Sequence, residues 1–371
     1  MSFSSKKIIT ALFLLLTVSL TTFAVKVNVP LTDNGAWSLN TQPAAVYAQD
    51  NFYFSWINKS GDLMISSYNQ TTDVVTVATV ATGYGTEDFA SPALLVRASG
   101  QILIFASKNT TESGFQCYRS TSTTGDITAG FSSQTMTGYG INATLPFAMG
   151  DHIVVLWRSK NNFGYTFIKD ANAATATAAL GAGSRAGFLN TTIANSYQFR
   201  DEVPTIRAVQ GIDGIHMAIT QLGTGLKYSN STVHYAKIVL KTDNTGIQFQ
   251  KADGTTTTLN YDTPPDVVYT TTQATDKTIA YDITLIDNKP AILYDAFNGE
   301  NVNAATNPGS TSNHTYKLAK WDGTQWNSFT VADAGDGLPI TNYTAVGGKT
   351  FLANSYQVGG GSFDSANPTV L

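Results

Sequence analysis

The chain has 371 residues, of which 42% are apolar and only 13% are charged, and its formal net charge is −4. It has no block of basic residues, whereas proteins that bind phosphate backbones cluster Lys and Arg, so the composition argues against nucleic acid as a partner. Polar positions are filled mainly by Thr, Ser, Asn and Gly. Together with frequent Tyr and Phe, this favours strands and turns over helices.

The N-terminus has the pattern of a secretory signal peptide. Lys6 and Lys7 precede a short apolar run, Ile8–Leu20, and Thr22-Phe23-Ala24 offers small residues for cleavage. We expect residues 1–24 to be removed, leaving a secreted, extracellular protein with no membrane segment. The alternative is an uncleaved anchor, although the run is short of the roughly 20 apolar residues of a comfortable span.

One short phrase recurs along the rest of the chain: an apolar strand, a tight polar turn, an apolar or aromatic strand, and a polar stretch before a third strand. Six copies occur: Ala45–Tyr68, Ala93–Arg119, Pro146–Ile168, Thr205–Ile238, Asp282–Trp321 and a weaker one from Ala345. Gly, Asn or Asp stands at each reversal, as tight turns require. Such repetition predicts an all-β fold, a β-propeller of about seven four-stranded antiparallel blades.

No linker divides residues 25–371, which we expect to form a single propeller domain. Val358–Leu371 resembles a strand, a turn and the start of another strand. This pattern predicts a last blade that is truncated at the C-terminus.

The sequence also bears on modification and redox chemistry. Cys117 is the sole cysteine; its apolar neighbours predict a buried structural thiol, and the count excludes a cysteine-based zinc site. Sequons suggest a glycoprotein if the source is a eukaryote. They begin at Asn58, Asn69, Asn109, Asn142, Asn190, Asn230, Asn313 and Asn342.

Several phrases resemble those of the BNR-repeat-containing family of secreted β-propellers, which includes ulvan-type polysaccharide lyases. Asn34–Ser67 resembles the family's opening, and EDFASPALLV at Glu87–Val96 is similar to its "DDHNxPALLV". Further matches follow in order at Tyr118–Ile127, Ser231–Lys237, Lys251–Thr255, Tyr281–Leu285 and His314–Trp321. The resemblance implies a propeller that binds or processes an extracellular, acidic polysaccharide.

The catalytic residues of the lyases do not carry over. Where the family has histidines, in "DDHN" and in a following "HN" phrase, this chain has Phe89 and Lys108. Phenylalanine transfers no proton, and an ordinary lysine is charged at pH 7 and is a poor base.

Lyase chemistry needs a base, an acid and a cation that neutralises the uronate carboxylate. His234 is a candidate base, while the adjacent Tyr235 should point to the opposite face of the strand. Arg158 suits bidentate carboxylate binding, and His314 resembles a retained family position, so Arg158, His234 and His314 are the candidate substrate-binding residues. Each could equally be structural: a hydrogen-bonded histidine, or an arginine in a surface ion pair.

The remaining histidines point to structural roles. His216 lies in an apolar strand and is expected in the core, and His152 is expected in a solvent-exposed turn.

Three other functions are alternatives for this chain. Sialidase-type hydrolysis would need an arginine cluster, yet no arginine lies in an Arg-Ile-Pro context, and Thr123–Phe131 is only a degenerate aspartate-box turn. Glycoside hydrolysis by paired carboxylates stays open. A catalytically inactive glycan-binding or interaction propeller is the third; its tryptophans offer no clear sugar platform, since Trp56 and Trp157 should be core and Trp321 and Trp326 flank a hairpin.

No phosphate loop, HExxH or calcium loop is present. We therefore expect no cofactor and no metal, and a monomer whose partner is a polysaccharide or glycan.

Overall fold

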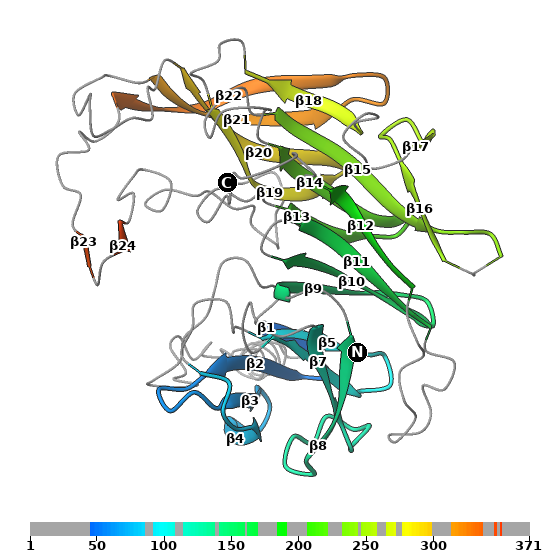
Figure 1. Cartoon of the computed structure of the whole chain (residues 1–371), viewed down its shortest axis with the longest axis vertical. Coiled ribbons are helices and arrows are strands. Elements are labelled where there is room, and N and C mark those ends of the chain that lie inside the picture. Colours follow the sequence, from blue (N-terminus) through cyan, green and yellow to red (C-terminus); the bar gives the residue numbers. More distant parts are fainter. Residues whose placement is uncertain are drawn as a thin grey trace, which may run out of the picture. The chain divides into compact units, whose positions relative to one another are not determined.

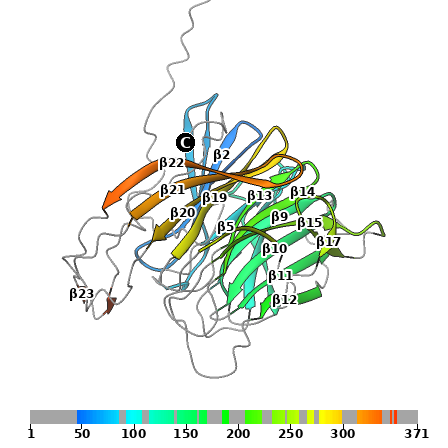
Figure 2. The ribbon, with the colours of Figure 1, turned by 90° about the horizontal axis from the view of Figure 1, so that it is seen from above.

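The structure, a computed structural model, is all-β throughout its described part (Figures 1 and 2). It describes residues 45–85, 92–107, 114–137, 141–159, 162–169, 184–190, 206–221, 232–243, 246–257, 265–271, 277–298, 313–336, 345–346 and 349–350. Among these residues there is no helix, and hence none long and apolar enough to cross a bilayer. The predicted signal peptide and most of the last repeat lie outside the described residues.

Four of the sheets have four antiparallel strands in simple up-and-down order. Sheet A holds β1 (Ala45–Ala48), β2 (Asn51–Ile57), β3 (Leu63–Asn69) and β4 (Val74–Ala81). Sheet B holds β5 (Ala93–Val96), β6 (Ile102–Ala106), β7 (Gly114–Ser120) and β8 (Phe131–Thr137). Sheet C holds β9 (Ile141–Met149), β10 (His152–Ser159), β11 (Asn162–Lys169) and β12 (Ser184–Asn190). Sheet E holds β19 (Lys277–Ile286), β20 (Lys289–Asn298), β21 (Asn313–Trp321) and β22 (Trp326–Asp336).

Sheet D differs because its fourth strand is split. After β13 (Ile206–Gly211), β14 (Gly214–Gln221) and β15 (Thr232–Leu240), the short β16 (Ile247–Gln250) pairs with one half of β15. The chain continues through β17 (Thr256–Thr257), which pairs with β16. It then returns as β18 (Asp266–Thr270), which pairs with the other half of β15. A further small sheet pairs β23 (Ala345–Val346) with β24 (Lys349–Thr350).

Successive sheets pack face to face in chain order, each pair around its own apolar cluster. Ile65 and Ile104 belong to the cluster between sheets A and B, and Cys117 and Trp157 to the one between B and C. Sheets C and D share a third cluster, and D and E a fourth. Sheets B, C and D therefore bury both faces, which explains continuous apolar runs such as ILIFA in β6.

This arrangement of four-stranded sheets is a β-propeller, as the repeated phrase predicts. The first five copies of that phrase coincide with the first three strands of sheets A to E. The blade count of about seven stays a prediction, because the sixth copy is described only at β23 and β24.

Hydrogen bonds add specificity to these sheet–sheet contacts. Between B and C, the Thr144 hydroxyl donates to the carbonyl of Phe105 at 3.3 Å. Between D and E, Arg207 Nε donates to the carbonyl of Tyr281 at 2.9 Å, within a bulge of β19. The amide of Ala280 in the same bulge donates to Thr220 Oγ1 at 2.8 Å, so two side chains of sheet D hold the irregular part of β19.

The turns use the residues that the sequence singles out. Asp287 and Asn288 both have positive φ, at 54° and 58°, which fits the tight turn between β19 and β20. The predicted aspartate-box-like turn is confirmed as a local device: Asp126 Oδ1 accepts from the amide of Thr128 at 2.8 Å and from its hydroxyl at 2.7 Å. Asp253 with Thr255, and Asp322 with Thr324, repeat the same pattern.

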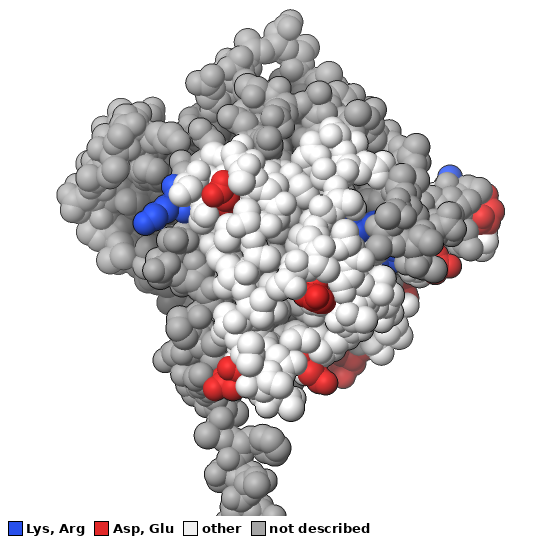
Figure 3. All heavy atoms as spheres, turned by 90° about the horizontal axis from the view of Figure 1, so that it is seen from below, with Lys and Arg blue, Asp and Glu red and all other residues white. Residues whose placement is uncertain are grey.

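Charged side chains are sparse on the described surface. Figure 3 shows a face on which most described atoms belong to uncharged residues, with a few carboxylates towards its border. This matches the low charged content of the sequence.

A glycine in sheet C gives a test of the packing between sheets B and C. Gly164 pairs across the strands with Trp157, and a Cβ at this position would overlap the indole. We predict that Gly164→Ala lowers the free energy of unfolding by about 1–3 kcal/mol, the usual cost of overpacking. Urea unfolding measures this loss.

Gly246 provides the matched control, since a Cβ there meets nothing within 4 Å. Gly246→Ala should leave stability nearly unchanged. Equal effects of the two substitutions would contradict the tight packing of Trp157.

Candidate functional site

The described candidate residues lie at corresponding edges of their sheets. In an up-and-down sheet, the second strand ends and the third begins at one edge, which we call the entry edge. Arg158 is the last residue but one of β10, the second strand of sheet C. His234 and His314 stand near the beginnings of β15 and β21, the third strands of sheets D and E.

The two positions at which the resemblance implies histidines, Phe89 and Lys108, lie outside the described residues.

The structure describes the side chain of only one candidate, His234. Arg158 pairs with Ala143 and Phe163 along the backbone, and His314 pairs with Phe297, but their side chains lie outside the described residues. The distances among the three candidate side chains are therefore not defined, and no described contact brings them together.

His234 is almost fully buried, with 5% of its surface exposed. It pairs with Ile219 in β14 and with Val267 in β18, next to a bulge between Val233 and His234. Its Nδ1 atom is buried without a hydrogen-bond partner. An orphaned polar atom of this kind costs free energy, so it is a place where a polar ligand or water would be stabilised.

Burial sets the charge of His234. Desolvation lowers the pKa of its imidazole to about 4, against the opposing effect of hydrogen bonds with the backbone of Asp266 and Pro265. The ring is therefore neutral at pH 7. A general base works best with a pKa near the working pH, so His234 is a weak base but a suitable neutral hydrogen-bonding group.

Tyr235 points to the other face of β15, as the sequence predicts. Its ring belongs to the cluster between sheets D and E and lies 5.2 Å from the ring of Trp326. Ala236 and Ile238, which share the strand face of His234, belong instead to the cluster between sheets C and D. His234 and Tyr235 therefore cannot serve one site as base and acid.

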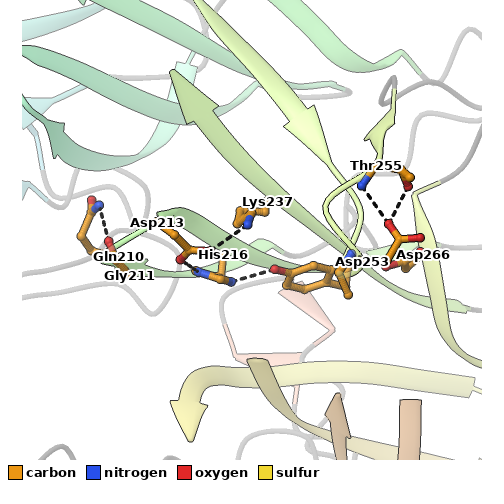
Figure 4. Close-up of polar contacts among 10 residues, drawn as sticks. Gln210, Gly211, Asp213, His216, Lys237, Asp253, Thr255 and Asp266 are labelled. Atoms are coloured by element: carbon orange, nitrogen blue, oxygen red, sulfur yellow. Dashed lines mark hydrogen bonds and ion pairs between the residues drawn. The ribbon is translucent and has the colours of Figure 1, made fainter. Parts of the chain in front are cut away.

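A polar network on sheet D, missed by the sequence interpretation, joins Tyr235 to His216 (Figure 4). His216 Nδ1 lies 2.7 Å from the Tyr235 hydroxyl, and His216 Nε2 lies 2.8 Å from Asp213 Oδ1. Lys237 Nζ donates to Asp213 Oδ2 at 2.7 Å. Because a carboxylate only accepts, Nε2 carries the proton and Nδ1 accepts from the tyrosine.

This Asp–His–Tyr arrangement has the order of a charge relay but is closed to solvent. His216 and Tyr235 are each 1% exposed. Desolvation lowers the pKa of His216 and raises that of Tyr235, whose proton is further held by the charges of Asp213 and Asp266. Burial alone would raise the pKa of Asp213, but hydrogen bonds from Lys237 and His216 outweigh it and the net shift is downward.

The network is therefore structural, and it confirms that His216 is a core residue. Its signal in the sequence is the turn Gly211-Ile212-Asp213-Gly214, which places a carboxylate three residues before a histidine that an apolar strand must bury. Asp213 remains about half exposed while its oxygens hold both partners.

Asp266 closes the excursion that splits the fourth strand of sheet D. Its Oδ2 accepts from the amide of Ala252 at 2.6 Å, so the two ends of the excursion are joined beside Tyr235 (Figure 4). Desolvation raises the pKa of this carboxyl, against the hydrogen bond from Ala252.

The prediction that His152 lies in a solvent-exposed turn is wrong. His152 is 8% exposed and begins β10, pairing with Met149 and Lys169. The turn consists of only Gly150 and Asp151, so the histidine already belongs to the strand. Its ring packs 4.9 Å from the ring of Phe167.

The other structural expectations for single residues hold. Cys117 is a free, buried thiol, and Trp56 and Trp157 are core residues. Trp321 and Trp326 pair across their hairpin with ring centroids 5.6 Å apart. In the described part of the chain, no group of three His, Cys, Asp or Glu side chains gathers that could hold a metal ion.

Comparisons with known proteins give structural likenesses only. No family model and no curated protein matches the chain. An ulvan lyase from a new polysaccharide lyase family, solved bound to -[GlcA(1-4)Rha3S]-, is 16% identical with a TM-score of 0.49, covering 80% of this chain and 73% of that one. A second solved structure of an ulvan lyase from this new family is 15% identical with a TM-score of 0.48. The match covers 80% of this chain and 71% of that one.

A third solved structure is an endo-1,5-α-L-arabinanase from Thermotoga petrophila RKU-1 in complex with TRIS. It is 10% identical with a TM-score of 0.36, and the match covers 84% of this chain and 77% of that one. At these identities the likenesses concern the fold, and no residue role is carried over from them.

The buried imidazole of His234 should make stability depend on pH. The pKa of this imidazole is about 4 in the folded state and ordinarily 6.5, so the unfolded chain binds the extra proton first as the pH falls. Its contribution is complete above pH 6.5 and is lost as the pH falls towards 4, by up to about 3 kcal/mol at about 1.4 kcal/mol per pKa unit. His216 acts in the same direction.

Urea unfolding of the wild type and His234→Gln between pH 7 and pH 4 checks this. The variant should show a shallower loss of stability with acid, by about 1.4 kcal/mol per pH unit at most. Identical slopes in the two proteins would contradict a buried neutral His234.

Removing one hydroxyl tests the Asp213–His216–Tyr235 network. Tyr235→Phe leaves His216 Nδ1 buried without its partner, which should lower the free energy of unfolding by about 1–3 kcal/mol. Tyr47→Phe is the control, because that hydroxyl is exposed and bonded only to Asp50. A neutral effect of Tyr235→Phe would mean that the network contributes nothing.

Proposed function

We propose that this chain is a secreted β-propeller that binds an extracellular acidic polysaccharide across the entry edges of its sheets. The binding function is primary, and turnover by a lyase reaction is the second candidate. The signal-like N-terminus supports export, and the family resemblance of the sequence supports a polysaccharide as partner.

One observation carries this proposal. Arg158, His234 and His314, the candidate substrate-binding residues of the sequence, stand at the entry edges of three consecutive sheets, C, D and E. In a propeller, loops from successive blades on one side surround the central channel. A polymer laid across that side would meet residues from several blades.

Arg158 suits an anionic polymer, because its guanidinium can bind a carboxylate through two parallel hydrogen bonds.

Lyase turnover is favoured by one feature, the unpartnered Nδ1 of His234, a nitrogen of the type that accepts the proton α to a uronate carboxylate. Three features oppose it. That nitrogen is buried in a side chain that is only 5% exposed, out of reach of a polymer. A pKa of about 4 makes this imidazole a weak base at pH 7, and Tyr235 on the opposite face cannot supply the acid. Binding without turnover is therefore the better-supported function.

Affinity gel electrophoresis with ulvan, alginate and pectin tests binding. We expect retardation by at least one uronate polymer, and Arg158→Ala should weaken it about tenfold, equivalent to 1.4 kcal/mol. Lys320→Ala is the matched charge control, because it removes a cation near the end of β21, away from the entry edge.

Ultraviolet absorbance of the same mixtures separates binding from lyase action, because β-elimination creates an unsaturated uronate. Growth of that absorbance in the wild type and its loss in His234→Gln would establish the lyase function. Binding by no uronate polymer, together with no absorbance change, would overturn both candidates.

A further inference from the structure

A row of aromatic side chains crosses sheet A on the face turned away from sheet B. Tyr47, Phe52 and Tyr68 are directly opposite one another on β1, β2 and β3, and Val75 on β4 continues the row. Strand alternation places Val46, Tyr53 and Ile65 on the other face, where they join the cluster between sheets A and B. The row is therefore not part of that core.

The row is open to solvent. Tyr47 is 52% exposed, and Phe52 and Val75 are each 37% exposed. The ring centroids of Tyr47 and Phe52 are 4.7 Å apart, and those of Phe52 and Tyr68 are 6.5 Å apart with an angle of only 18° between planes. Contiguous exposed aromatic surface of this kind marks an interaction site more often than an isolated apolar residue does.

The border of the row is polar and acidic. The hydroxyl of Tyr47 donates to Asp50 Oδ1 at 3.2 Å, and the hydroxyl of Tyr68 donates to Asp73 Oδ1 at 3.2 Å. Asp50 and Asp73 stand in the β1–β2 and β3–β4 turns, both with positive φ. A carboxylate can accept about four hydrogen bonds, so Asp50 retains capacity beyond Tyr47.

We propose that this row, which we call the sheet A platform, binds neutral pyranose units of a glycan. The C–H faces of a sugar ring would lie on the aromatic rings, and its hydroxyl groups would donate to Asp50 and Asp73. The two carboxylates repel uronates, so the platform takes neutral sugars, in contrast to the acidic polymer proposed for the entry edges. This inference goes beyond that function and uses a different part of the sheet.

The position of the platform separates the two sites. Tyr47 and Phe52 flank the β1–β2 turn, and Tyr68 and Val75 flank the β3–β4 turn. These turns lie at the edge opposite the entry edge of sheet A. A ligand on the platform therefore does not overlap the entry edge of the same sheet.

A second copy of the chain is a poorer occupant. It would bring its own Asp50 and Asp73 against the same carboxylates, and β1 to β4 contain no Lys or Arg to offset them. Like charges brought together at an interface cost free energy. A neutral, hydroxyl-rich ligand meets no such repulsion and satisfies the border.

Affinity electrophoresis of the full chain in gels that contain galactomannan, hydroxyethylcellulose or dextran tests the platform. We expect retardation by at least one of these neutral polymers. Phe52→Ala and Tyr47→Ala should each weaken it about tenfold, and Asp50→Asn should weaken it less. Tyr47 lies on the edge strand β1, so Tyr47→Ala serves if Phe52→Ala fails to fold.

Phe329→Ala is the matched control, because Phe329 is 55% exposed on an edge strand of sheet E. It should leave retardation unchanged. Absence of retardation in all three neutral polymers, or equal weakening by Phe329→Ala, would overturn the platform. Ulvan, alginate and pectin in parallel gels report the entry edges separately, so absence of retardation by all three uronate polymers, with a neutral polymer still causing retardation, overturns the function proposed above and leaves the platform intact.

Discussion

The burial of both faces of sheets B, C and D is the constraint on which the rest of the structure depends. Each of these sheets contributes alternate side chains to two apolar clusters, one with the sheet before it and one with the sheet after it. A strand in such a sheet cannot slip by one residue without exposing one cluster and disrupting the other. Register and sheet order are therefore fixed together, and with them the edge at which each hairpin lies.

Polar groups inside this stack are accommodated in two different ways. His216 is fully partnered by Asp213 and Tyr235, which makes it a fixed part of sheet D. His234, next to Tyr235 but on the opposite face of β15, keeps a buried Nδ1 without a hydrogen-bond partner. The same residue type is thus fully partnered on one face of sheet D and left with an unsatisfied nitrogen on the other.

The sequence contains most of the fold and little of the site. Alternation and turn residues predict the strands because local backbone chemistry determines them, as the β19–β20 turn at Asp287 and Asn288 shows. The partners of His216 are Asp213, three residues away, and Tyr235 on the next strand, 19 residues away. His152 is buried because the turn before it consists of only two residues and the strand begins at once. Such facts arise from tertiary packing, which no local pattern encodes. The roles of Arg158 and His314 stay predictions, since their side chains lie outside the described residues.

The split fourth strand of sheet D has a consequence for how this scaffold can vary. β16 and β18 each pair with their own half of β15, and β17 pairs with β16, so only the number of residues between β17 and β18 can change without shifting a ladder. The hydrogen bond from the amide of Ala252 to Asp266 Oδ2 ties the segment after β16 to the start of β18. Evolution, or a protein engineer, could graft a new recognition loop there while the blade beneath stays as it is.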